Sequence, residues 1–164
     1  RFDVLSDYGA FRDLQRHRML TIEWQRLSTR HGYITPDAIA DIGATAAWDQ
    51  VMERTAALAD RIESAHGPVA AQYAVPFAYR IRYYLDMNAR EAFHLLELRS
   101  QASGHPRYRT IAQEMHRLIR DEAGHRVIAD AMRFVDHNDY DLARLEEERR
   151  LAAKRAARGI EDEE

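Results

Sequence analysis

The sequence contains no cysteine, seven glycines and four prolines. Without cysteine the chain forms no disulfide, no thiolate metal site and no cysteine nucleophile, and we expect a cytoplasmic protein. Neither a glycine-rich phosphate loop (GxGxxG or GxxxxGK) nor a GxSxG nucleophile elbow is present. No apolar run approaches the roughly 18 residues of a membrane-spanning helix, so we expect no membrane partner.

A strong excess of charge of one sign is also missing. The 164 residues carry a formal net charge of −3, so no overall basic field attracts nucleic acid, and we expect no nucleic-acid partner. A hydrophobic content of 46% with 31% charged residues is typical of a folded globular protein of one domain. The first residue is not methionine and the opening residues are charged, so we expect a fragment without a signal peptide.

The spacing of apolar residues predicts an α+β fold that is mostly helical. The alternation of apolar and polar residues over 77–87 predicts one half-buried strand, and residues 19–34 a loop with some extended structure. The expected helices run from Ser6 or Asp7 to about Arg18, from Thr35 to His66, from Pro68 to Val75, from the cap Asn88 through residue 100, and from Pro106 to about Phe134. We therefore expect a domain over 1–138, followed by a charged helix and acidic tail over 139–164.

Arginine dominates the basic residues. Among 24 lysines and arginines only Lys154 is a lysine, and arginine suits bidentate capture of phosphate or carboxylate groups. The segment 16–31 combines Arg16-His17-Arg18 with Ser28, Arg30 and His31, a composition suited to a polyanionic ligand. A solvated basic helix end, complementing the helix dipole, is the alternative.

A second set of polar residues lies on the helix headed by Asn88. His94 and Arg99 are on this helix, and Arg99 follows Leu95 and Leu96 closely enough to lie beside its apolar face. An arginine in such a place needs an anionic ligand or, alternatively, a salt bridge to a neighbouring acid.

A Glu-x-x-His pattern occurs twice, as Glu91-x-x-His94 and Glu122-x-x-His125. Ferritin-like di-metal bundles use two such pairs with two further glutamates. The glutamates that are available on other expected helices are Glu53, Glu63 and Glu114. A di-metal helical protein is therefore one alternative, although such pairs also arise by chance in a chain with this many acids.

The two arginine-containing segments, in this order, resemble the flavin-dependent thymidylate synthase (ThyX) family. The family signature of Arg-His-Arg followed by Ser-x-Arg is similar to Arg16-His17-Arg18 with Ser28-x-Arg30. The family's Leu-Pro, aromatic strand, Asn and Leu-x-Leu-Arg are similar to Val75-Pro76, the tyrosine-rich strand, Asn88 and Leu96-x-Leu98-Arg99. The resemblance covers about residues 12–134 and implies that the N-terminal third of the family domain is missing from 1–138.

This resemblance implies a homotetramer that binds FAD and the small-molecule nucleotide dUMP at sites shared between subunits. Hydride passes from NADPH to FAD, and methylenetetrahydrofolate supplies the carbon that becomes the methyl group of the product. No protein nucleophile and no metal is used. The implied contacts are Arg16, His17, Arg18, Asn88 and His94 with FAD, Ser28 and Arg30 with the phosphate of dUMP, and Arg99 with the pyrimidine, where it favours the polarised anionic form as the catalytic residue.

The sequence departs from the family at three places. Nine residues (19–27) separate Arg18 from Ser28, which is two more than in the signature. Gln72 stands where the family usually has a nucleotide-binding arginine, and the segment after Arg99 reads Gly104-His105-Pro106-Arg107-Tyr108. These departures leave open a degenerate ThyX-like module kept for assembly or nucleotide binding without turnover.

Overall fold

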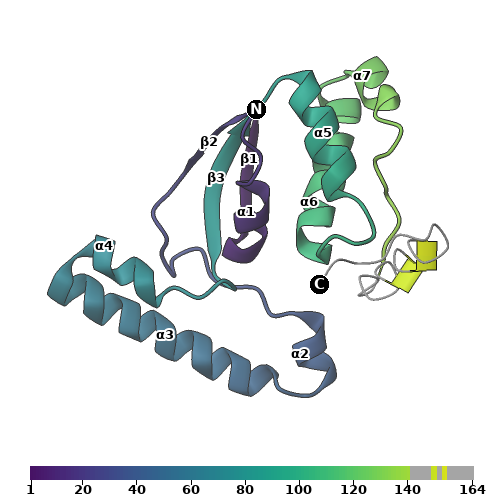
Figure 1. Ribbon diagram of the computed structural model, residues 1–164. Helices are drawn as coiled ribbons and strands as arrows, with labels where there is room; N and C mark the ends of the chain where they lie inside the picture. Colours follow the sequence, from purple (N-terminus) through teal and green to yellow (C-terminus); the bar gives the residue numbers. More distant parts are fainter. Residues whose placement is uncertain (141–148, 151–152, 155–164) are drawn as a thin grey trace. The chain divides into compact units, whose positions relative to one another are not determined.

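The computed structural model describes residues 1–140, 149–150 and 153–154. The chain forms two compact units, Arg1–Met87 and Asn88–Glu164, each of which is described by itself (Figure 1). The combination of helices with a small antiparallel sheet confirms the expected α+β class. Most of the charged helix and acidic tail expected over 139–164 lies outside the described residues.

A three-stranded sheet organises the first unit. Its strands are β1 (Phe2–Asp7), β2 (Thr21–Trp24) and β3 (Arg80–Asp86), in the order β1-β3-β2 with both neighbouring pairs antiparallel (Figure 1). The buried side chains of β3 are Ile81, Tyr83 and Leu85. The expected strand over 77–87 is thus confirmed, with its first ladder residue at Arg80.

Strand β1 was not expected, because Val4 was assigned to the apolar pattern of the first helix. Pairing with β3, in which Val4 lies opposite Tyr83, places this segment in the sheet instead. Helix α1 (Tyr8–Leu14) begins after Asp7, whose carboxylate accepts a hydrogen bond of 2.8 Å from the Ala10 backbone N–H, as a helix N-cap does. The helix ends at Leu14 rather than near Arg18, so the Arg-His-Arg sequence lies in the connection to β2.

The helix expected from Thr35 to His66 is two helices, α2 (Asp37–Asp41) and α3 (Thr45–His66). Gly43 interrupts them with a left-handed φ of 69°, a conformation that costs glycine little. The expected cap at Thr35 is also wrong, since Pro36 holds the cap position and no side chain caps α2. Helix α3 ends at His66, directly before Gly67, as expected, and is followed by the short helix α4 (Pro68–Ala71) and the 3-10 turn η1 (Gln72–Ala74).

A small apolar core joins α3 to the chain that enters β3. Met52, Val75 and Tyr79 are buried in it, and half-buried Leu27 and Trp48 pack against them. The Tyr79 hydroxyl donates a 2.7 Å hydrogen bond to the Met52 carbonyl, so the core has a polar link as well. Leu27 ties the segment between β2 and α2 to this core.

The second unit contains α5 (Ala89–Arg99), α6 (Pro106–Arg117), the π-helical turn η2 (Leu118–Glu122) and α7 (Arg126–Ala131). Asn88 caps α5 as expected, because its side-chain oxygen accepts a 3.0 Å hydrogen bond from the Glu91 backbone N–H. The helix expected from Pro106 to about Phe134 is wrong in its second half. The π-helical turn and Gly124, with a φ of 70°, separate α7 from α6.

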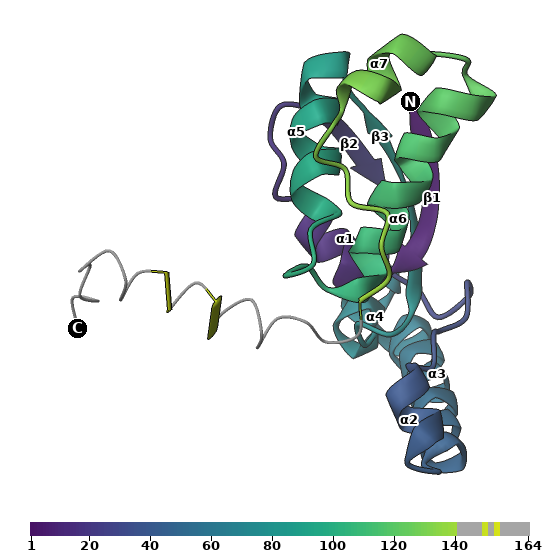
Figure 2. The same ribbon diagram turned by 90° about the vertical axis from the view of Figure 1, so that its right-hand side faces the viewer.

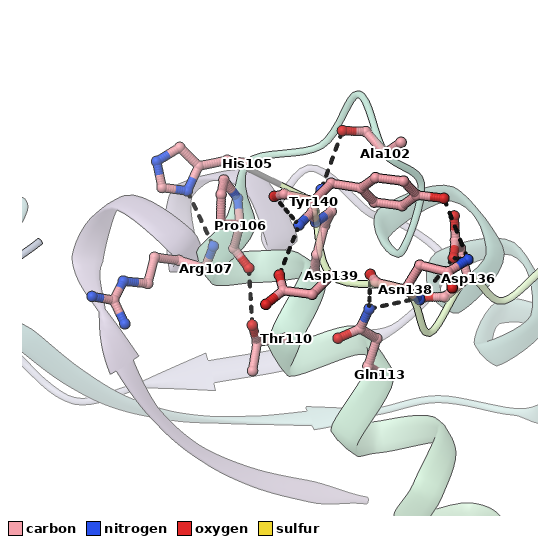
Figure 3. A network of polar contacts seen from close by, with 11 residues as sticks. Ala102, His105, Pro106, Arg107, Thr110, Gln113, Asp136, Asn138, Asp139 and Tyr140 are labelled. Carbon is pink, nitrogen blue, oxygen red and sulfur yellow. Dashed lines mark hydrogen bonds and ion pairs between the residues drawn. The ribbon is translucent and has the colours of Figure 1, made fainter. Parts of the chain in front are cut away.

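A buried arginine of α6 forms hydrogen bonds with the chain after α7. Arg109 is 3% exposed and donates to the carbonyls of Ala102 at 3.2 Å and Tyr140 at 2.7 Å. Gln113, one turn along α6, donates to the carbonyls of Asp136 at 2.9 Å and Asn138 at 3.2 Å. Figure 3 shows these contacts, and Figure 2 shows the chain after α7 passing along α6. Within the described part of the chain, no helix is long and apolar enough to cross a membrane.

Candidate functional site

A pocket of about 390 Å³ lies in the first unit, between the segment 25–31 and the helices α3 and α4. The segment contributes every residue from Gln25 to His31, and the opposite wall consists of Ala59, Asp60, Glu63, Pro68, Ala71 and Val75. Apolar Ala71 and Val75 are buried at the base, whereas the rim carries hydroxyl, guanidinium and carboxylate groups. We call the residues Gln25–His31 the pocket loop.

The pocket loop is held by backbone and amide contacts. The Leu27 backbone N–H donates a 3.1 Å hydrogen bond to Oε1 of Gln72, at the start of η1. At the other end of the loop, the Gly32 N–H donates to the Thr29 carbonyl at 3.2 Å, with Gly32 at a left-handed φ of 69°. Gln72 thus supplies an acceptor for the loop at the position where the family usually has an arginine.

Ser28 and Arg30 both line the pocket, and their role in holding a phosphate stays a prediction. Ser28 Oγ accepts a 3.4 Å hydrogen bond from the Arg30 backbone N–H. The Arg30 guanidinium extends across the pocket rim to α3, where its Nη2 lies 3.0 Å from Glu63 Oε1 and 3.3 Å from Oε2. The spacer 19–27 contains β2, and its extra length still leaves Ser28 and Arg30 side by side in one pocket.

The pocket carries charges of both signs. Arg26 and Arg30 face it from the loop, while Asp60 and Glu63 face it from α3. His31 also lines it, with Nε2 at 2.9 Å from Gln25 Oε1. An anionic group that enters this pocket finds guanidinium and hydroxyl donors on the loop side only.

The Arg-His-Arg residues follow α1 and do not line this pocket. Their side chains alternate in exposure: Arg16 and Arg18 are exposed, whereas His17 is 6% exposed. Arg16 forms a 3.6 Å ion pair with Asp13 in the last turn of α1. The two guanidiniums therefore face solvent, where a large anion can reach them.

The remaining predicted residues belong to the second unit. Asn88 uses its side-chain oxygen as the α5 cap, His94 is exposed, and Arg99 is half-buried at the end of α5. The Arg99 guanidinium lies over the ring of Tyr108, 5.3 Å from its centroid, in a cation–π contact. The predicted residues are thus divided between the units, with Arg16, His17, Arg18, Ser28 and Arg30 in the first.

Tyr108 was missed as a neighbour of Arg99. The segment that departs from the family places it there, because a Cβ on Gly104 would lie 2.7 Å from Tyr108 Cε2. Glycine at 104 therefore allows the tyrosine ring to lie against the turn. The signal in the sequence was the aromatic residue two positions after the Gly-His-Pro break.

The di-metal alternative gains no support from the described residues, which contain no group of three or more histidines, aspartates or glutamates that could hold a metal ion. Its second Glu-x-x-His pair is also not a pair on one helix. Glu122 ends the π-helical turn, whereas His125 lies beyond Gly124, immediately before α7.

Comparisons with known proteins agree with the motifs. A UPF0159 protein of Chlamydia pneumoniae is 44% identical over 150 residues, which are 91% of this chain and 28% of that protein. A UPF0159 protein of Thermoplasma acidophilum is 38% identical over 154 residues, covering 93% of this chain and 30% of the relative. The chain therefore spans less than a third of the length of these relatives.

Among solved structures, a UMP/dUMP methylase PolB from Streptomyces cacaoi, bound with 5-Br UMP, has a similar fold. The TM-score is 0.64 at 17% identity, over 82% of this chain and 75% of that one. The Thy1 family, described as thymidylate synthase complementing protein, matches residues 1–124. The chain belongs to this family, which is the ThyX family.

Proposed function

We propose that this chain supplies the nucleotide-binding part of a flavin-dependent thymidylate synthase, which methylates dUMP with methylenetetrahydrofolate and NADPH. Family membership and the fold of a UMP/dUMP methylase support a nucleotide substrate and a methyl transfer. The observation that carries the proposal is the pocket loop, in which Ser28 and Arg30 line one pocket. As in the family, we propose a homotetramer.

The phosphate of dUMP is proposed to bind at the pocket loop. Arg30 offers a charge-assisted donor, and the hydroxyls of Ser28 and Thr29 line the same pocket. Arginine keeps its charge at any physiological pH, so this donor does not depend on a titration. The pocket loop therefore binds and orients the nucleotide rather than taking part in bond making.

Arg99 is proposed as the residue that stabilises negative charge on the pyrimidine. Its guanidinium is permanently charged, and the ring of Tyr108 limits the directions in which it can point. A fixed cation near a carbonyl that gains charge lowers the barrier without moving a proton. Arg99 is thus the proposed catalytic residue, and Tyr108 orients it.

The residues of the Arg-His-Arg sequence suit the flavin cofactor that the family uses. FAD carries a diphosphate, and the exposed guanidiniums of Arg16 and Arg18 flank a buried His17, so two cations are available to one extended anion. Asn88 and His94 are proposed to contact FAD from the second unit. When bound, FAD would carry the reducing equivalents that NADPH supplies, and the chain's own residues would bind and orient it.

The proposal is tested by dUMP binding to Arg30→Ala. Loss of one charge-assisted contact to phosphate is expected to weaken binding about 10- to 100-fold. Arg54→Ala is the matched control, because Arg54 is an exposed arginine of α3 outside the pocket lining. Calorimetry on both variants checks the expectation, and equal affinities in Arg30→Ala and the unaltered chain would contradict it.

A binding module without turnover is the second candidate. The observations that favour it are Gln72, whose amide holds Leu27 where the family usually has an arginine, and Glu63, which pairs with Arg30. Both reduce the positive charge available to a phosphate. Such a module would assemble and bind nucleotide weakly but would hold little or no FAD.

A further inference from the structure

The ion pair between Arg30 and Glu63 lies in the pocket proposed for the nucleotide phosphate. Both oxygens of the Glu63 carboxylate contact one nitrogen of the guanidinium, Nη2, at 3.0 and 3.3 Å. Both side chains line the pocket, and both are accessible, at 74% for Arg30 and 36% for Glu63. A carboxylate of the protein therefore occupies a donor group that an incoming anion needs.

We propose that Glu63 is a specificity-determining residue that competes with the ligand's phosphate for Arg30. The inference rests on the proposed function and goes beyond it, since it assigns to α3 a carboxylate that weakens anion binding. A bound phosphate either displaces Glu63 from Nη2 or lies close to its negative charge. In both cases Glu63 lowers affinity in proportion to the charge that the ligand carries.

The solvent exposure of the Arg30–Glu63 pair determines how much Glu63 lowers the affinity for phosphate. Ion pairs open to solvent contribute little free energy, so a phosphate dianion can replace the carboxylate on Arg30. Glu63 itself stays at the rim, because its backbone belongs to the last turns of α3 and its carbonyl accepts the Gly67 N–H at 2.9 Å. Arg26 and Asp60 also line the pocket, but the hydrogen bonds from Arg30 Nη2 to both carboxylate oxygens make Glu63 the direct competitor for that guanidinium.

The competition predicts different behaviour for charged and uncharged ligands. A nucleoside without phosphate does not need Arg30, and its affinity is independent of Glu63. A nucleoside monophosphate, or inorganic phosphate alone, loses affinity to Glu63. The carboxylate thus sets how strongly the pocket discriminates by phosphate charge.

The test uses the full chain with Glu63→Gln, which keeps the shape of the side chain and removes its charge. Inorganic phosphate, dUMP and deoxyuridine are titrated separately, and the Arg30 Nε–H resonance is followed by NMR. We expect affinity for phosphate and for dUMP to rise about two- to fivefold, the range that an exposed ion pair supports. Affinity for deoxyuridine is expected to stay unchanged.

Two controls separate local competition from net charge and from structural change. Glu53→Gln removes the same charge from an exposed position of α3 outside the pocket lining, and is expected to leave phosphate affinity unchanged. In an Arg30→Ala background, Glu63→Gln is expected to give a smaller gain than in the unaltered chain, because the contested guanidinium is gone and only the repulsion between carboxylate and phosphate remains.

The outcomes distinguish this inference from the proposed function. Unchanged or weaker phosphate binding in Glu63→Gln overturns the competition, whatever dUMP does. Tighter phosphate binding with no dUMP binding in either protein upholds the competition and contradicts the proposed nucleotide. An equal gain for deoxyuridine overturns the inference, because it shows a change of pocket shape rather than of charge.

Discussion

A single residue, Gln72, holds the pocket loop in position. Its Oε1 accepts the Leu27 N–H at 3.1 Å, and its Nε2 lies 3.4 Å from the Val69 carbonyl. The amide therefore links the loop to the chain that leaves α4. This contact gives Gln72 a structural role at the position where the family usually has an arginine.

Replacing Gln72 by leucine is expected to lower the free energy of unfolding by about 1 kcal/mol, because the partly buried Leu27 N–H loses its acceptor. Gln72→Glu is the matched variant, since a carboxylate oxygen still accepts that hydrogen bond. Urea unfolding of both variants checks the difference. Equal stability of the leucine and glutamate variants would show that the contact does not hold the loop.

The contact between Glu63 and Arg30 is a feature that the sequence does not predict. Serine and arginine at 28 and 30 were recognised from their motif, and the structure places both in one pocket. The partner of Arg30 is 33 residues away on α3, and no local pattern links the two positions. Long-range pairs of this kind depend on how α3 packs against the loop.

Among contacts between elements, the histidine pair His116 and His137 joins α6 to the chain after α7. His116 Nε2 lies 2.9 Å from the Ala129 carbonyl and must carry the donor proton, so in the neutral ring Nδ1 accepts from His137 Nε2, also at 2.9 Å. Burial of the His137 ring, and then the neighbouring His116, lower the pKa of His137, while Asp136 acts in the opposite direction.

This lowered pKa predicts that stability falls in acid. The unfolded chain takes up a proton on His137 near its ordinary pKa of about 6.5, before the folded chain does. The contribution of the neutral His137 ring to the free energy of unfolding is therefore complete above that pH, and it is lost as the pH falls through the pKa of the folded chain. Urea unfolding at pH 7.5 and 5.5 is expected to show a larger loss for the unaltered chain than for His137→Gln. Identical losses in both proteins would contradict the assignment.

Local signals explain which elements were predicted. Asp7 and Asn88 are caps that act within three residues, and Gly67 and Pro68 mark the end of α3, so these boundaries follow from neighbouring residues. Strand β1 exists because β3 pairs with it across a long stretch of sequence. The breaks at Gly43 and Gly124 were hidden because the apolar spacing continues across them.

The chain as a whole has the fold of its family but covers only part of the length of its relatives. The chain covers 28% and 30% of the two relatives described above, yet the family matches residues 1–124. Candidate phosphate contacts lie in the first unit, whereas Arg99 lies in the second. We propose that these residues bind both a flavin and a pyrimidine nucleotide.

The binding of flavin and nucleotide is tested by one measurement, the visible absorption spectrum of the chain after incubation with FAD and removal of free ligand. We expect retained flavin bands that shift further when dUMP is added, because the nucleotide is proposed to bind beside the flavin. A colourless protein, or flavin bands that do not respond to dUMP, would contradict a flavin-dependent thymidylate synthase site in this chain.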